Sequence, residues 1–233
     1  MEYSDLKKVV LEYNPHANLE LLERAFEFAK EAHKGKKRES GEDYMVHLFA
    51  VAMKLAELHM DSVTIAAGLL HDVLEDTQTK PERLVDLFGS EVFNLVQGVT
   101  KTTSVNIASS DEQRASNIRN VLLATAKDIR VIIIKLADRL HNMQTLKFLS
   151  LDRQRVIAQE SLDVYAPIAY KLGMYKIKAE LEDLAFRYLE PGLYQEFKVR
   201  IGKKLSDRQI EVEHFIKVLE DELRRLKVPA RVF

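Results

Sequence analysis

Residues that interrupt helices are scarce in this chain. It contains only 8 glycines and 5 prolines among 233 residues, and its stretches rich in Leu, Ala, Glu and Lys favour the α-helix. The β-branched run at 131–134 could form a strand, but apolar residues continue at helical spacing through Leu136, Leu140 and Met143. The sequence therefore predicts an all-α fold.

The same spacing predicts where the helices begin and end. The polar segment 33–43 is broken by glycines, so it is expected to form a loop, and 100–111 is expected to form another because it lacks periodicity. The ranges predicted to be helical are 19–33, 45–59, 62–74, 81–88, 90–98, 112–126 and 128–149.

Charge and cysteine content exclude several kinds of protein. The chain has 35 Lys and Arg against 36 Asp and Glu, a net charge of −1, so no overall field attracts nucleic acid or an anionic membrane, and no direct nucleic-acid partner is expected. The absence of cysteine excludes disulfides and thiolate metal sites. No segment has the ~20 apolar residues of a membrane span, and no cleavable signal is recognisable. We expect a cytoplasmic protein without membrane contact.

Ionisable side chains are concentrated in the segment His71–Asp76. The preceding residues, 64–70, are apolar and suited to burial, and burying charges beside them costs free energy unless a partner or a metal compensates. His47 lies upstream in an apolar segment, and Asp138 lies downstream in another. With His71 and Asp72 they provide two imidazoles and two carboxylates, a plausible ligand set for a divalent metal.

The remaining acids of this segment suggest a reaction. If the helix continues, Glu75 and Asp76 lie one turn beyond His71 and Asp72 and reach over the same site. Mixed imidazole and carboxylate ligands suit Mn²⁺, Fe²⁺ or Zn²⁺ better than Ca²⁺ or Mg²⁺. Glu75 and Asp76, which are not needed as ligands, can position or deprotonate a water molecule.

Polar residues on the helix of Asp138 share its face. Asn142 and Thr145 follow Asp138 at i+4 and i+7 and can offer neutral hydrogen bonds beside the metal. Arg139 and His141 are expected to point elsewhere, into contacts behind the ligands or between helices. His33 lies on an apolar face and is expected to be a satisfied core residue rather than a ligand.

A basic loop precedes His47. Residues 33–38 carry several cations suited to a polyanionic substrate, and the planar guanidinium of Arg38 could stack on a base. Taken alone, such a loop is more often a solvated turn.

These residues occur together in a known pattern. The sequence resembles the HD superfamily of metal-dependent phosphohydrolases and, more closely, the hydrolase domain of the RelA/SpoT family of bacterial alarmone enzymes. The resemblance covers roughly 20–192. It is carried by four blocks in the expected order, at 32–47, 68–77, 126–146 and 165–191. Three positions depart from the family pattern: Glu39 replaces a lysine or small residue, Leu48 replaces the usual proline, and Gln144 replaces a common arginine. The loop 100–111 also lacks lysines that are frequent in the family.

The resemblance implies a reaction and a role for each residue. The implied reaction removes the 3′-pyrophosphate of ppGpp or pppGpp, giving GDP or GTP, and so degrades the alarmone of the stringent response. The implied metal is Mn²⁺, and the implied ligands are His47, His71, Asp72 and Asp138. The implied catalytic acids are Glu75 and Asp76, and the residues implied to contact the guanosine nucleotide are Arg38, Ser40, Asn142 and Thr145.

The resemblance also implies an HD-domain helical bundle with a long C-terminal lead-in helix. Residues 1–192 are expected to form the hydrolase domain, and 193–233 a helical linker towards a synthetase domain that this sequence does not contain. Two alternatives remain open. One is another HD phosphohydrolase acting on nucleotides, and the other is a regulatory module without hydrolase activity that docks through the apolar stripe at 210–226.

Overall fold

The computed structural model describes residues 2–103 and 127–226. Within them the only β-structure is an isolated bridge between Lys37 and Asp43, which confirms the all-α prediction. The predicted helix 112–126 and most of the predicted loop 100–111 lie outside the described residues. The first residues of that loop are helical, because α6 extends to Thr103.

The chain divides into two compact units, 1–185 and 186–233. The predicted division into 1–192 and 193–233 stays a prediction. The long C-terminal helix is α12, Pro191–Arg225. None of the described helices is both long enough and apolar enough to cross a membrane.

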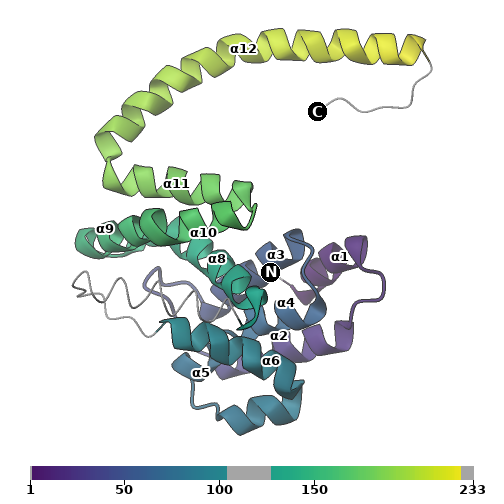
Figure 1. Ribbon diagram of the computed structural model, residues 1–233, viewed down its shortest axis with the longest axis vertical. Coiled ribbons are helices and arrows are strands. Elements are labelled where there is room, and N and C mark those ends of the chain that lie inside the picture. The colour runs from purple at the N-terminus through teal and green to yellow at the C-terminus, as the bar shows by residue number, and fades with distance from the viewer. Residues whose placement is uncertain (1, 104–126, 227–233) are drawn as a thin grey trace. The chain divides into compact units, whose positions relative to one another are not determined.

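The described part of the chain contains the following elements before α12 (Figure 1). They are α1 Tyr3–Tyr13, α2 Leu19–Ala32, α3 Tyr44–Glu57, α4 Ser62–Leu70, α5 Val73–Asp76, α6 Pro81–Thr103, α8 Ile129–Gln144, the 3₁₀ helix η1 Leu146–Phe148, α9 Leu151–Glu160, the π-helix η2 Ser161–Tyr165, α10 Ala166–Lys171 and α11 Tyr175–Leu189.

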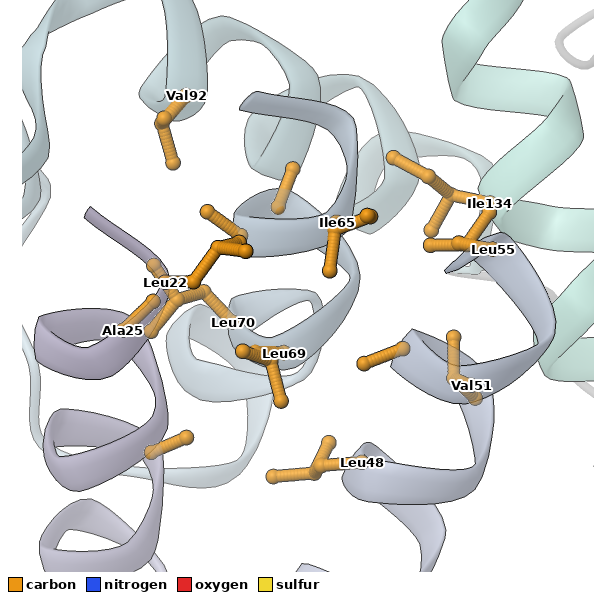
Figure 2. Close-up of a cluster of buried hydrophobic side chains, with 14 of the residues drawn as sticks. Leu22, Ala25, Leu48, Val51, Leu55, Ile65, Leu69, Leu70, Val92 and Ile134 are labelled. Carbon is orange, nitrogen blue, oxygen red and sulfur yellow. The ribbon is translucent and has the colours of Figure 1, made fainter. Parts of the chain in front are cut away.

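Helix α4 lies at the centre of the first unit. Its sequence is apolar on all sides, and it packs against α2, α3 and α6, as a helix surrounded by other helices should. Figure 2 shows Leu69 and Leu70 of α4 among side chains of α2 and α3, and both are completely buried. The core therefore fixes the position of the segment that follows α4.

The predicted helix 62–74 is interrupted where that segment begins. Helix α4 ends at Leu70, and α5 starts at Val73. The amides of Glu75 and Asp76 both donate to the carbonyl of Asp72, at 3.2 Å and 2.9 Å, so a new turn starts there. The prediction of one continuous helix was wrong at this point, where Nδ1 of His71 lies 2.8 Å from the Gly68 carbonyl.

The predicted loop 33–43 forms a tight turn before α3. Gly35 and Gly41 adopt φ of 77° and 83°, a left-handed conformation that side chains with a Cβ rarely tolerate. The Lys37–Asp43 bridge closes the turn, and the Asp43 carboxylate caps α3 by accepting from the Met45 amide at 2.8 Å. The loop thereby brings its basic side chains to the N-terminus of α3.

We expect Leu69→Ala to lower the free energy of unfolding by about 2–5 kcal/mol, because it leaves a cavity in the tightly packed core. Urea unfolding followed by circular dichroism measures the change. Leu151→Ala is the matched control, since Leu151 is 76% exposed, and it should change the stability by less than about 0.5 kcal/mol. Equal effects of the two substitutions would contradict the central role of α4.

Candidate metal centre

Three elements bring two imidazoles and a carboxylate together. His47 comes from α3, His71 follows the last residue of α4, and Asp138 comes from α8. One ligand atom of each lies within 4.8 Å of the others, so the group can hold a metal ion. The Nε2 atom of His47 is 3.3 Å from Oδ1 of Asp138, and Nε2 of His71 is 3.8 Å from it.

Asp72 completes the group. Its Oδ2 atom lies 3.2 Å from Nε2 of His71 and 3.6 Å from Nε2 of His47. The phenol of Tyr44 donates to the same oxygen at 2.8 Å; burial, together with the Asp72 carboxylate, raises the pKa of Tyr44, so it remains a donor. The structure thus brings together the four residues that the sequence suggested as ligands.

Burial and neighbouring charges shift the pKa values of the residues at this site in opposite directions. Burial alone lowers the pKa of His71, but the neighbouring Asp72 and Asp138 carboxylates outweigh it and raise this pKa to about 10. The same contacts with the histidines hold the pKa values of Asp72 and Asp138 well below their usual range, against the effect of burial. Positive charge between the carboxylates is therefore strongly favoured.

The hydrogen bonds of His71 fit a metal. Its Nδ1 atom lies 2.8 Å from the Gly68 carbonyl, which can only accept, so Nδ1 carries a hydrogen. Its Nε2 atom is buried and makes no hydrogen bond within the part of the chain that the structure describes. In the neutral ring this nitrogen presents a lone pair towards two carboxylates, an arrangement that a cation would stabilise.

The two acids of α5 lie beside this group and face solvent more than the ligands do. The Oδ2 atom of Asp76 forms an ion pair with Nζ of Lys36 at 2.8 Å, and the same ammonium lies 3.4 Å from the Asp76 carbonyl. Glu75 is exposed on the same turn. Lys36 was anticipated only as one of several loop cations, and its pairing with Asp76 was not.

The residues predicted to contact a nucleotide are not all at one place. The guanidinium of Arg38 donates to Asn142 Oδ1, and Asn142 Nδ2 donates to Asp138 Oδ1 at 2.7 Å. Thr145 donates from Oγ1 to the His141 carbonyl at 3.0 Å, on its own helix. The hydroxyl of Ser40 donates to the Glu42 carboxylate at 3.1 Å, within the loop. Among the described residues, no contact joins Ser40 to the metal centre.

His141 lies closer to the centre than its position in the sequence suggested. As expected it makes an inter-helix contact, but the partner is His47, with the two Nδ1 atoms 2.9 Å apart. Burial, with His47 and Arg38 nearby, lowers the pKa of His141 to about 4. Arg139 also joins helices, through an ion pair with Glu160 at 2.9 Å.

His33 is buried as predicted, at 1% exposed. Its Nδ1 atom lies 3.0 Å from the Ala29 carbonyl, and its ring stacks on Tyr44 with the centroids 5.0 Å apart. Its Nε2 atom has no hydrogen-bond partner in the described part of the chain, so the ring is satisfied at one nitrogen rather than at both.

The chain is similar to proteins of known classes. A family model described as the HD domain matches residues 25–175. A probable guanosine-3′,5′-bis(diphosphate) 3′-pyrophosphohydrolase of Synechocystis is 48% identical over 210 residues, which are 90% of this chain and 27% of that protein. The bifunctional (p)ppGpp synthase/hydrolase SpoT of Escherichia coli is 40% identical over 230 residues, 99% of this chain and 33% of that protein.

A solved structure is similar as well. It is a metazoan ortholog of SpoT described as hydrolysing ppGpp, with a TM-score of 0.55 and 26% sequence identity. The match covers 74% of this chain and 96% of that one. The chain spans about a third of the length of the curated relatives it matches, between 27% and 33% for the two above.

We expect the binding of a divalent metal ion to release close to one proton at pH 8, because His71 is protonated below its pKa of about 10 and must lose that proton to become a ligand. The apparent affinity should rise with pH by up to about tenfold per unit. Calorimetric titration in two buffers with different enthalpies of ionisation measures the proton count. A count of zero at pH 8 would contradict a proton held between these carboxylates.

Proposed function

The chain belongs to the HD domain family, and from that premise we propose that it hydrolyses the 3′-pyrophosphate of (p)ppGpp, giving GDP or GTP and pyrophosphate. The observation that carries this proposal is the proximity of four side chains: ligand atoms of His47, His71 and Asp138 lie within 4.8 Å of one another, and Asp72 Oδ2 lies 3.2 Å from His71 Nε2. Relatives similar over nearly the whole chain have names that state this activity, which supports the same substrate here.

We propose that these four residues hold Mn²⁺. The Nε2 atom of His71, which faces Asp72 at 3.2 Å and Asp138 at 3.8 Å, and the two low-pKa carboxylates fit a divalent cation with mixed nitrogen and oxygen ligands. Such an ion, when bound, lowers the pKa of a water molecule and neutralises charge on a phosphate.

Glu75 and Asp76 are proposed as the acids that move protons. Both lie on the short α5 turn directly after Asp72, so they flank the ligands without occupying the cluster. Glu75 is exposed and accessible to a substrate, whereas Asp76 is held in place by Lys36 at 2.8 Å. A carboxylate so placed can accept a proton from the attacking water or return one to the leaving group.

The proposed nucleotide contacts are Arg38, Ser40, Asn142 and Thr145. Arg38 gives one N–H from Nη1 and one from Nη2 to α8, and the flat face of its guanidinium can stack on a base without breaking either contact. Lys36 adds positive charge on the same loop, which suits a substrate carrying several phosphates.

The prediction that tests this function uses two substitutions. Asp72→Ala should abolish pyrophosphate release from ppGpp in the presence of Mn²⁺, because a buried ligand is lost. Glu75→Gln should reduce kcat by about 10²- to 10⁴-fold, the usual contribution of a proton-transfer group, with Mn²⁺ affinity within about threefold of the unmodified chain. Release of pyrophosphate is measured by a coupled assay.

Glu20→Gln is the matched control, since its side chain is 82% exposed on α2, and it should leave the rate unchanged. Unaltered activity of Asp72→Ala or of Glu75→Gln would refute the role given to that residue. A panel of substrates addresses the other enzymatic alternative, because faster cleavage of a deoxynucleoside triphosphate or a cyclic nucleotide than of ppGpp would favour a different HD phosphohydrolase.

The alternative of a regulatory docking module without hydrolase activity leads to a different expectation. It requires no metal, so the absence of any Mn²⁺-induced rise in melting temperature would favour it, whereas a ligand that binds the folded state raises that temperature.

A further inference from the structure

The outer nitrogens of the two histidines at the metal centre meet different partners. The Nδ1 atom of His71 is held by a main-chain carbonyl, which defines its hydrogen. The Nδ1 atom of His47 lies 2.9 Å from Nδ1 of His141. Either of two neutral imidazoles can donate to the other, so this contact alone leaves open which nitrogen of His47 carries the hydrogen.

Arg38 removes the ambiguity. Its Nη1 atom lies 3.2 Å from the same Nδ1 atom of His141, and a guanidinium can only donate. His141 must therefore present a lone pair at Nδ1, and the hydrogen between the two rings belongs to His47. The lone pair is shared by two donors, while a second hydrogen bond to Asn142 Oδ1 keeps Arg38 in place.

We propose that His141 is a positioning residue that, together with Arg38, fixes the tautomer of His47 and aims its Nε2 lone pair at the metal. With the hydrogen on Nδ1, this lone pair faces Oδ1 of Asp138 at 3.3 Å. A ligating histidine usually donates its other N–H to a carboxylate or a carbonyl, whereas here a second imidazole is the acceptor. The inference rests on the metal centre of the proposed function.

A second branch of contacts supports this role of Arg38. Because Arg38 donates to Oδ1 of Asn142, the amide must turn its Nδ2 atom towards Asp138, to which it donates at 2.7 Å. One side chain from the loop thus sets the hydrogen-bond direction behind two ligands. The acceptor on His141 and the amide of Asn142 lie on neighbouring residues of α8, so both branches begin at one guanidinium.

The test removes the acceptor and then restores it. In His141→Leu the Nδ1–H of His47 loses its partner, and we expect the Mn²⁺ affinity to fall by about 10- to 100-fold, as is usual when the group behind a ligand is lost. In His141→Asn the Oδ1 atom approximates the position of the lost Nδ1 and accepts from both donors. This variant should stay within about fivefold of the unmodified chain. Electron paramagnetic resonance of free Mn²⁺ measures the affinities.

A control on the same helix separates this effect from general damage. Gln144→Ala changes an exposed residue of α8 and should leave the affinity unchanged. Equal affinities of the His141→Leu variant and the unmodified chain, or equal losses in the Leu and Asn variants, would overturn the proposal.

The unmodified protein provides a readout that does not depend on any variant folding. Nitrogen-15 histidine spectra of the chain loaded with Zn²⁺, a diamagnetic probe, should show His47 protonated at Nδ1 and His141 unprotonated there. The opposite pattern would overturn the proposal even if the substituted chains did not fold.

Two variants of the ligands themselves distinguish the role of His141 from the existence of the metal centre. His71→Ala and Asp138→Ala remove ligands directly and should abolish tight Mn²⁺ binding. If they do so while His141→Leu binds normally, the metal centre stands and the role of His141 falls. If the two ligand variants bind Mn²⁺ as the unmodified chain does, the metal centre itself is refuted.

Discussion

The repulsion between two partly buried carboxylates is the constraint around which the metal centre is arranged. Asp72 and Asp138 lie close to the same two histidines, and two negative charges so near each other cost free energy unless positive charge lies between them. Donors supply part of the compensation, from Tyr44 to Asp72 and from Asn142 to Asp138. The buried ammonium of Lys135, 3.8 Å from Oδ2 of Asp138, supplies a further part, and a proton or a metal ion between the carboxylates would add to it. Metal binding therefore changes the charge balance of the fold.

Much of the fold could be predicted because its causes are local. The apolar segment 64–70 predicted a buried helix, and α4 is the most enclosed helix of the core. The break after Leu70 could not be predicted from periodicity, because apolar residues continue at Val73 and Leu74. The contact of Nδ1 of His71 with the Gly68 carbonyl orients the ring, and a new turn, α5, carries Glu75 and Asp76.

The members of the site were easier to predict than their contacts. His47, His71, Asp72 and Asp138 stand out because each ionisable side chain lies in or beside an apolar segment. The pairing of Lys36 with Asp76 and of His141 with His47 spans 40 and 94 residues, and helical spacing carries no information on such distances. For Tyr44 a local signal existed, since it lies one turn before His47 on the same helix.

Arg38 connects the loop to the ligands, and this limits how it can also serve a substrate. Its guanidinium cannot give the same N–H groups to a phosphate and to α8. If a phosphate took them, His141 would no longer be obliged to accept, and the direction of the hydrogen bond to His47 would be undefined. A stacked base uses the face of the guanidinium and leaves its edges bonded. Stacking on the base, with other cations such as Lys36 near the phosphates, therefore keeps both contacts of Arg38 with α8 intact.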